Sequence, residues 1–393
     1  MSTAIASEAK SAFFRSRWVD APQGTEELDP SGLAPGFRAA GVACGVKRGG
    51  GTDVGLLVCD AAAPRSALLL TTNAAAAAPV QLCRAETDAA AIRAAVVNSG
   101  NANAATGEQG YRDAVAMRDA AAEALGLNGR SIAVAETGTI GVPLPLDDVL
   151  AGVRVAAGAL REDGGEELAE AIMTTDRAPK LCSVRCDDVT VSAQAKGAGM
   201  IEPHFATMLC FVQTDAEIED PDAALRSASA SSFERITVDG QTSTNDTVLL
   251  QSTGEAGKPL PAGLLEAVLL GLALEIVADG EGATRVGRID VTQAASADEA
   301  ERVARAIANS PLVKASLHGR DANWGRIAQA AGMALAGEPV PELGPARIDA
   351  AELGTDSAEA HVAIRLGRGS EGAHAYFCDL TSDYVHLNAS RAT

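Results

Sequence analysis

Short apolar runs with strand character alternate along this chain with alanine-rich stretches of helical character, and nothing repeats at a fixed period. We expect strands where aliphatic residues are bounded by polar ones, at residues 54–59, 67–71, 94–98 and 208–214. We expect helices where apolar residues recur with helical spacing, at 111–125 before the stop signal Gly126, from the capping candidate Asp147 onward, and at 264–277 and 296–307. This alternation predicts an α/β fold of layered mixed sheets covered by helices.

The composition narrows the class of protein. A length of 393 residues with 47% hydrophobic content allows one large or two ordinary domains around a well-buried core. No apolar run reaches the roughly 20 residues of a membrane helix, and the first residues lack the regions of a secretory signal. We therefore expect a cytoplasmic protein with no membrane partner. A net charge of −20 without a basic run argues against nucleic acid as a partner, because phosphate binding needs clustered lysine and arginine.

The cysteines, glycines and histidines match none of the common site motifs. The seven cysteines are scattered, and the closest pair, Cys182 and Cys186, has no nearby histidine, so we expect reduced, packed thiols and no metal site. Neither G-x-x-x-x-G-K-[ST] nor a strand-borne G-x-G-x-x-G occurs, which disfavours a nucleotide site. The absence of G-x-S-x-G and H-E-x-x-H disfavours serine and zinc hydrolases.

Five clusters rich in glycine, asparagine, threonine and aspartate stand at the ends of apolar segments. Turn chemistry accounts for any one of them, because these residues tolerate left-handed backbone and bond their own main chain. Five together favour a shared functional site, since such sites are built from loops on a rigid scaffold. The clusters cover residues 98–103, 137–141, 196–200, 243–247 and 279–284.

Thr207 stands between one of these glycine-punctuated loops and an apolar strand. As a β-branched residue it fits the start of a strand. It also stands where an N-terminal nucleophile would: a cut between Ala206 and Thr207 would leave a free α-amine beside the threonine hydroxyl. An amine with a pKa of about 7.7–8.0 can serve as the base without a histidine. The residue types alone leave both interpretations open.

From residue 36 to its C-terminus the chain resembles the ornithine acetyltransferase family, also called bifunctional glutamate N-acetyltransferases. The most specific block is 196–208 (KGAGMIEPHFATM), and the cluster at 279–283 (DGEGA) supports it. The resemblance implies an αββα-type sandwich and self-cleavage between Ala206 and Thr207. Residues 1–33 are polar and lack periodicity, so we expect an extension there. The resemblance further implies an α chain at 34–206 and a β chain at 207–393, which together build one catalytic unit and assemble as an (αβ)₂ heterotetramer.

The resemblance also implies a ping-pong reaction in arginine biosynthesis, in which Thr207 takes an acetyl group from N-acetylornithine and passes it to glutamate. Thr137 and Gly138 match the family's oxyanion hole, and Glu281 matches a catalytic position. No cofactor is implied, and acetyl-CoA is an alternative acetyl donor. Contacts with the amino-acid substrates are implied for Thr174, Thr175, Lys196, Thr207, Glu281, Asn388 and Thr393.

Two other functions remain open, both using Thr207. One is a related acyltransferase of a secondary-metabolite pathway. It is raised by departures from the family pattern, such as Glu136 where a small residue is usual and Gln241 where an acid is common. The other is an N-terminal-nucleophile amidase or aminopeptidase, in which water takes the acyl group.

Overall fold

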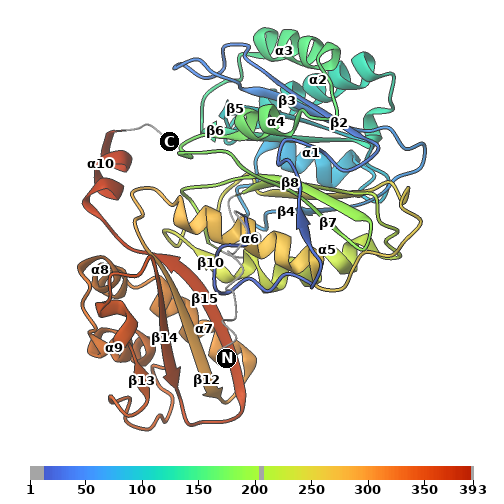
Figure 1. Cartoon of the computed structure of the whole chain (residues 1–393). Coiled ribbons are helices and arrows are strands. Elements are labelled where there is room, and N and C mark those ends of the chain that lie inside the picture. Colours follow the sequence, from blue (N-terminus) through green and yellow to red (C-terminus); the bar gives the residue numbers. More distant parts are fainter. Residues whose placement is uncertain (1–12, 203–207, 391–393) are drawn as a thin grey trace.

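The structure is a computed structural model that describes residues 13–202 and 208–390, and its strands form three sheets (Figure 1). The six-stranded sheet has the order β1 (Glu26–Glu27), β7 (Lys180–Cys186), β8 (Val189–Lys196), β9 (Leu209–Thr214), β11 (Thr247–Ser252), β4 (Arg65–Leu70). The four-stranded sheet has the order β2 (Phe37–Val42), β3 (Val54–Cys59), β5 (Ala94–Asn101), β6 (Ile132–Thr139). The five-stranded sheet has the order β10 (Ile236–Thr237), β15 (Glu371–Cys378), β12 (Val286–Ala294), β14 (Glu359–Arg365), β13 (Ile348–Asp349). Each sheet contains both parallel and antiparallel pairs, which confirms the predicted mixed sheets.

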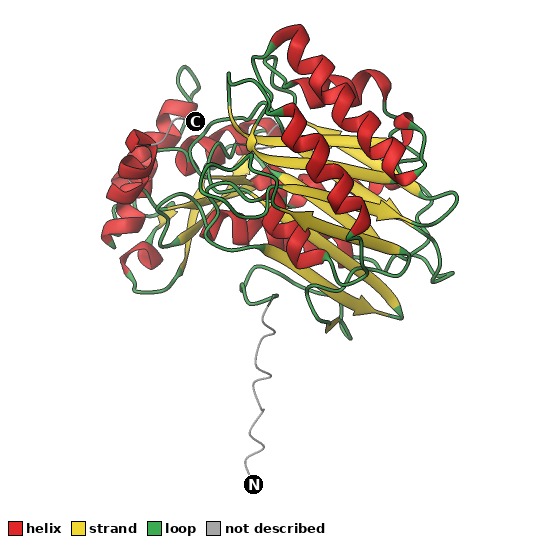
Figure 2. Cartoon of the chain, turned by 90° about the horizontal axis from the view of Figure 1, so that it is seen from above, coloured by secondary structure: helices red, strands yellow, loops and turns green. Residues whose placement is uncertain are grey.

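Helices cover these sheets, and the described residues form α1 (Ala78–Glu86), α2 (Gly107–Leu125), α3 (Leu146–Gly158), α4 (Gly165–Ile172), α5 (Pro221–Ser231), α6 (Leu264–Ala278), α7 (Ala297–Ala308), α8 (Pro311–Gly319), α9 (Trp324–Ala334) and α10 (Ser382–Ser390). Seen from above, helices lie over the strands, and a second group of helices stands at one side of the molecule (Figure 2). The predicted α/β class is confirmed.

The four-stranded and six-stranded sheets pack on each other in one unit. Leu209, Phe211 and Leu249 of the six-stranded sheet belong to the same buried cluster as the strands of the four-stranded sheet. Helices α2 and α3 cover the outer side of the smaller sheet, and α5 and α6 cover the far side of the larger one (Figure 1). Helix α4 contacts β2, β3 and β5 as well as β8, so the layers are those of an αββα sandwich with one helix inserted between the sheets.

The five-stranded sheet forms a second unit, with α7, α8 and α9 packed on one of its faces. Tyr376 and Cys378 of β15 point to the other face and join the cluster around α6. Eleven of the fifteen residues of α6 are buried, because the helix lies between the six-stranded sheet and the five-stranded one. A helix enclosed in this way is apolar on all sides rather than along one stripe.

Most of the expected elements are confirmed. Strand β3 and helices α2, α6 and α7 occupy their predicted segments to within a few residues, and Gly126 ends α2 in the left-handed conformation. The prediction that Asp147 caps a helix is wrong. Helix α3 begins at Leu146, after Pro145, so Asp147 lies in the first turn. Its charge is favourable there because backbone N–H groups give this end of a helix a partial positive charge.

Residues 13–33, the described part of the polar extension, lie against the core. Phe13 and Phe14 are buried in the cluster around α6, and β1 pairs with β7. The Glu27 carboxylate accepts the N–H of Phe13 at 2.8 Å, which holds the backbone of Phe13 against the rest of the extension. The division into an extension, an α chain and a β chain stays a prediction.

Two classes of feature are missing from residues 13–202 and 208–390. No helix there is long and apolar enough to cross a membrane. No group of three histidine, cysteine or acidic side chains is arranged to hold a metal ion. The seven cysteines are all free, and six of them are buried, as expected for packed thiols.

Helix α6 has no room for a side chain at Gly271, because a Cβ atom there would lie 2.8 Å from the ring of Phe13. We expect Gly271→Leu to lower the free energy of unfolding by about 1–3 kcal/mol, since overpacking outweighs the better helix propensity of leucine. Urea denaturation measures the change. Gly158→Ala, in α3 with open space around it, is the control and should be neutral or slightly stabilising. Equal stability of Gly271→Leu and the parent would contradict this packing.

Candidate functional site

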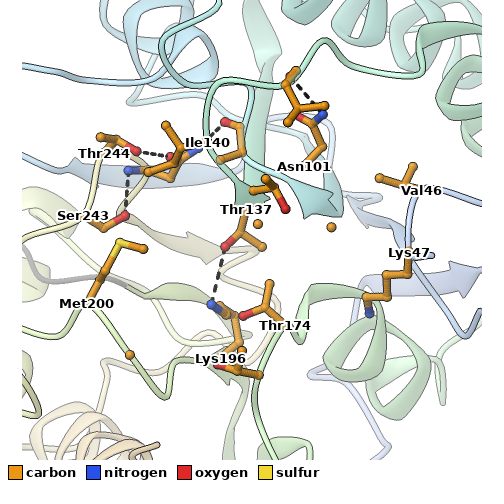
Figure 3. A pocket seen from close by; sticks show the side chains of 18 of the residues that line it. Val46, Lys47, Asn101, Thr137, Ile140, Thr174, Lys196, Met200, Ser243 and Thr244 are labelled. Carbon is orange, nitrogen blue, oxygen red and sulfur yellow. Dashed lines mark hydrogen bonds between the residues drawn. The ribbon is translucent and has the colours of Figure 1, made fainter. Parts of the chain in front are cut away.

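The five polar clusters converge on one cavity of about 810 Å³, a volume typical of ligand-binding pockets (Figure 3). The expectation that they lie together is therefore confirmed, and their shared function stays a prediction. Each cluster contributes to the lining, which includes Gly100, Asn101, Ala102, Thr137, Gly138, Thr139, Ile140, Lys196, Gly199, Met200, Ser243, Thr244, Asn245 and Glu281.

Strand pairing explains why distant clusters meet. Antiparallel pairing of β8 with β9 sets Lys196 opposite Leu209, and parallel pairing of β9 with β11 sets Leu209 opposite Thr247. The end of β8 therefore lies beside the starts of β9 and β11. Along β8, Val191 and Ala195 face the core around α6. Because side chains alternate along a strand, Lys196 lies on the opposite face, toward the four-stranded sheet.

Asn245 joins this edge to the four-stranded sheet. Its side-chain amide donates to the backbone carbonyl of Ala102 at 2.6 Å and to that of Glu136 at 2.8 Å. These carbonyls lie at the ends of β5 and β6, which run parallel and so finish at the same edge. One buried asparagine thus holds the ends of both sheets against each other.

Thr137 and Gly138 end β6 at the cavity wall. The Lys196 ammonium donates to the Thr137 hydroxyl at 3.4 Å, and the two side chains point toward each other (Figure 3). Gly138 has a φ of +133°, and a Cβ there would lie 2.3 Å from the backbone carbon of Gly100. Only glycine permits this approach of β5 and β6, so the hydroxyl and the neighbouring backbone are held at a fixed place in the cavity.

Lys196 brings a buried positive charge to the cavity, with only 4% of the residue exposed. Burial lowers the pKa of its ammonium, and the charges of Asp176, Asp246 and Glu281 partly offset that shift. An incoming carboxylate would meet a cation that is poorly hydrated and therefore a strong partner.

Glu281 contributes an acidic side chain to the same cavity. Its N–H donates to the carbonyl of Ala198 at 2.8 Å, which ties the turn after α6 to the loop after β8. Its carboxylate accepts from the amide of Asn388 at 2.7 Å. Asn388 belongs to α10, a helix without buried residues, and this contact brings it to the cavity.

The structure brings together most of the predicted site residues. Thr174 and Thr175 line the cavity, and Thr174 lies beside Lys196 (Figure 3). Ala206, Thr207 and Thr393 lie outside the described residues. The cavity is lined by Thr137, Gly138, Thr174, Thr175, Lys196, Glu281 and Asn388.

Met208, the residue that follows Thr207, donates its backbone N–H to the Asp246 carboxylate at 2.9 Å. Asp246 is buried, and burial raises the pKa of its carboxyl well above the usual range. Its second oxygen, Oδ2, has no hydrogen-bond partner among residues 13–202 and 208–390. A buried carboxyl group thus lies at the start of β9, against the backbone N–H of Met208.

The sequence reasoning missed several residues of the cavity wall, among them Lys47, Asp239 and Tyr384. Lys47 comes from the loop between β2 and β3, and its ammonium donates to the carbonyls of Thr52 and Glu170. Asp239 accepts the backbone N–H groups of Met200 and Gln241, and Tyr384 comes from α10. None of the three stands in a polar cluster, so only proximity in the fold identifies them.

Glu136 precedes Thr137 in β6, and its side chain is fully buried. Its carboxylate accepts the side-chain amides of Asn98 at 2.6 Å and Asn103 at 2.8 Å. Burial raises the pKa of this carboxyl to about 7, and the hydrogen bonds from Asn103 and Asn98 offset part of that shift. The Oδ1 atom of Asn98 is buried without a hydrogen-bond partner in the described part of the chain. Reversing that amide would pair Oδ1 with the proton of a neutral Glu136.

Comparisons with known proteins point to one family. A family model described as the ArgJ family matches residues 38–393. A protein of Symbiobacterium thermophilum named arginine biosynthesis bifunctional protein ArgJ is 45% identical, and the match covers 91% of this chain and 97% of that protein. Proteins of the same name from Thermus thermophilus and Streptomyces coelicolor are 42% and 40% identical. Those matches cover 92% and 91% of this chain, and 99% and 98% of the relatives.

Two solved structures are also similar. One is ornithine acetyltransferase from Mycobacterium tuberculosis, complexed with ornithine, at 39% identity and a TM-score of 0.44. It covers 46% of this chain and 98% of that chain. The other is the ArgJ protein of Bacillus halodurans, at 36% identity and a TM-score of 0.41, covering 46% of this chain and 96% of that chain.

The buried Glu136 makes stability depend on pH. Its native pKa of about 7 exceeds the ordinary value of 4.5, so the native state binds more protons between these pH values. The free energy of unfolding should therefore fall as the pH rises from 4.5 to 7, by at most about 3 kcal/mol. Glu136→Gln should remove that fall, as measured by urea unfolding at several pH values. The exposed Glu108, changed to Gln, is the control. Identical pH profiles for Glu136→Gln and the parent would refute a neutral Glu136.

Proposed function

The chain belongs to the ArgJ family, and from that membership we propose that it transfers an acetyl group from N-acetylornithine to glutamate. It is a bifunctional arginine-biosynthesis enzyme and an acyltransferase. One observation carries the proposed reaction: a single cavity gathers Thr137, Gly138, Lys196 and Glu281, and Lys196 pairs with Leu209, which follows Thr207 by two positions in the sequence.

Thr207 is the proposed nucleophile, freed by self-cleavage of the Ala206–Thr207 bond. Its hydroxyl attacks the acetyl carbonyl, and its new α-amine takes the hydroxyl proton. The amide C–N bond then breaks, ornithine leaves with that proton, and an acetyl ester remains on Thr207. In the second half, the glutamate amine attacks the ester and the ester C–O bond breaks. The proton that the amine loses returns to the Thr207 oxygen, and N-acetylglutamate leaves.

Thr137 and Gly138 are the proposed oxyanion hole. The Thr137 hydroxyl and the Gly138 N–H are donors that the tetrahedral intermediate needs in both halves of the reaction. The closeness of β5 and β6 at Gly138 supports this role, because a preorganised donor needs no rearrangement when charge develops. The ammonium of Lys196, 3.4 Å from the Thr137 hydroxyl, adds positive charge to the same wall.

The remaining residues are proposed to hold the substrates. Lys196 takes a carboxylate, and Glu281 takes an ammonium group or positions the Thr207 amine. Thr174 and Thr175 offer hydroxyls to the cavity, and Asn388 and Thr393 are proposed as further substrate contacts. One cavity serves donor and acceptor in turn, as a ping-pong mechanism requires. Acetyl-CoA is a second proposed acetyl donor, consistent with the bifunctional name of the relatives.

The assembly is proposed to follow from the cleavage. Lys196 lies before the proposed cut and pairs with Leu209, which lies after it. An α chain ending at residue 206 and a β chain starting at 207 would therefore share one sheet and one cavity. Two such αβ units would form the (αβ)₂ heterotetramer.

Mass spectrometry and activity assays test the proposed function together. Purified protein should consist of two fragments that meet at Ala206–Thr207, and it should form N-acetylglutamate from N-acetylornithine and glutamate. Thr207→Ala should remain one uncut chain without activity. A parent chain that stays whole yet active would refute the nucleophile. The donor alone is the matched control. Acetate released at equal rates with and without glutamate would indicate a hydrolase instead, and preference for another amine a secondary-metabolite acyltransferase.

Removing one oxyanion donor tests the role of Thr137. Thr137→Val keeps the shape of the side chain and removes the hydroxyl, so we expect kcat to fall by roughly 10²–10³. Thr137→Ser keeps the hydroxyl and is the control, with a much smaller effect. Steady-state kinetics measure both variants. Equal kcat values for the valine and serine variants would exclude the hydroxyl from the reaction.

A further inference from the structure

Three charged side chains, two of them buried, form an ion chain outside the lining of the cavity. The Lys180 ammonium lies 2.7 Å from the Asp176 carboxylate and 2.6 Å from the Asp279 carboxylate. The side chains of Asp176 and Lys180 are 0% and 4% exposed. None of the three lines the cavity, and none belongs to the proposed oxyanion hole.

One end of this ion chain holds two loops of the site. The Asp176 carboxylate accepts the backbone N–H of Gly197 at 2.7 Å through Oδ1 and that of Thr174 at 3.0 Å through Oδ2. Gly197 directly follows Lys196. The Thr174 loop and the end of β8 are therefore fixed by the same carboxylate.

The other end holds the turn that carries Glu281. Asp279 directly follows α6 and lies two residues before Glu281. Its carboxylate accepts the backbone N–H of Arg177 at 3.0 Å and the Arg177 Nε at 2.7 Å, in addition to the Lys180 ammonium. The turn after α6 is thus tied to residues 176–180, which are in turn tied to the end of β8.

The charges around Lys196 come from several elements. Asp176 and Lys180 lie on one side, Asp246 lies before β11, Glu281 lies after α6, and Lys47 lies between β2 and β3. Burial by itself would raise the pKa of the Asp176 carboxyl, but the charges of Lys196 and Lys180 lower it below its usual range. Among the groups that counter the loss of charge on Lys196, Asp176 has the largest effect.

Buried ion pairs add little net stability, because the loss of hydration offsets most of their attraction. Their use is geometric, since a carboxylate with several donors has one low-energy arrangement. Here that arrangement sets the spacing of three polar segments that no shared strand holds together. The ion chain is therefore better explained by the site than by the stability of the fold.

We propose that Asp176 is a positioning residue for substrate binding, which holds the Thr174, Lys196 and Glu281 segments in register through the Asp176–Lys180–Asp279 chain. The proposal rests on the proposed function, in which those three residues contact the amino-acid substrate. Asp176 acts through them and touches no reacting atom. It also supplies the counter-charge that keeps Lys196 protonated for binding a carboxylate.

The two roles of Asp176 have different signatures. Asp176→Asn keeps the size of the side chain, removes the charge, and leaves one N–H without its acceptor. Without the counter-charge, the pKa of Lys196 falls further. The pH above which carboxylate binding is lost therefore shifts to a lower value than in the parent. Asp279→Asn disturbs only the far end of the chain and leaves Asp176 charged. That change loosens the Glu281 turn without altering the charge state of Lys196.

The test measures KM for N-acetylornithine and kcat from pH 6 to 9, with thermal unfolding and self-cleavage recorded for each variant. We expect Asp176→Asn to raise KM about tenfold or more at pH 8, with a smaller rise at pH 6 and a kcat within a few-fold of the parent. We expect Asp279→Asn to raise KM by a factor that does not change with pH. Asp222→Asn is the matched control: it breaks an exposed pair with Arg226 on α5 and should leave KM unchanged.

Three results would overturn the proposal. One is a KM for Asp176→Asn equal to that of Asp222→Asn at every pH. Another is a loss confined to kcat with an unchanged pH profile of KM. If Asp176→Asn does not fold, an unaltered KM in Asp279→Asn would overturn the proposal by itself. The parent enzyme, assayed in parallel, separates these results from a failure of the proposed function, because that failure would remove acetyl transfer from the parent as well.

Discussion

The pairing of three strand ends determines most of what this site can be. Lys196 ends β8, Leu209 begins β9 and Thr247 begins β11, and the ladder holds these residues side by side. Backbone hydrogen bonds in a buried sheet leave no freedom of register, because a slip of one residue would turn Lys196 into the apolar core around α6. The cavity, the approach of Asn245 to the second sheet and the entry of the chain into β9 all depend on this register.

The site concentrates ionisable side chains in a core that is largely apolar. Lys196, Asp176, Lys180, Asp246 and Glu136 are all buried around the cavity, and each is costly to remove from water. The apolar clusters of the two units, with α6 enclosed between sheets, supply the stability that tolerates this cost. Violations of the usual burial rule are expected where a protein binds or reacts. Here they mark the cavity wall and the ion chain behind it.

The sequence predicted much of the fold because its periodicity is local. The span of α6 and the stop of α2 at Gly126 depend on residues within one or two turns, which a single segment contains. The predicted start of α3 at Asp147 was wrong, because proline and aspartate are both common at the first positions of a helix. Sheet order escaped prediction, since β11 pairs with both β9 and β4, and the β4 pairing joins residues as far apart in the sequence as Arg65 and Ser252. Sequence motifs also identified Thr137, Gly138, Lys196 and Glu281 as candidate site residues. The structure gathers them in one cavity.

What the sequence by itself determined is the list of chemical groups: a threonine before an apolar strand, a lysine and an acid in polar clusters, and glycines where the backbone is crowded. Only the tertiary structure decided which groups meet, how far Lys196 is buried and which residues hold it. Asp176 and Lys180 stand four positions apart just after the expected substrate contacts Thr174 and Thr175, and Asp279 follows about a hundred residues later. Their function depends on a distance of less than 3 Å and on the exclusion of water. Both are properties of packing between distant segments, which no local pattern encodes.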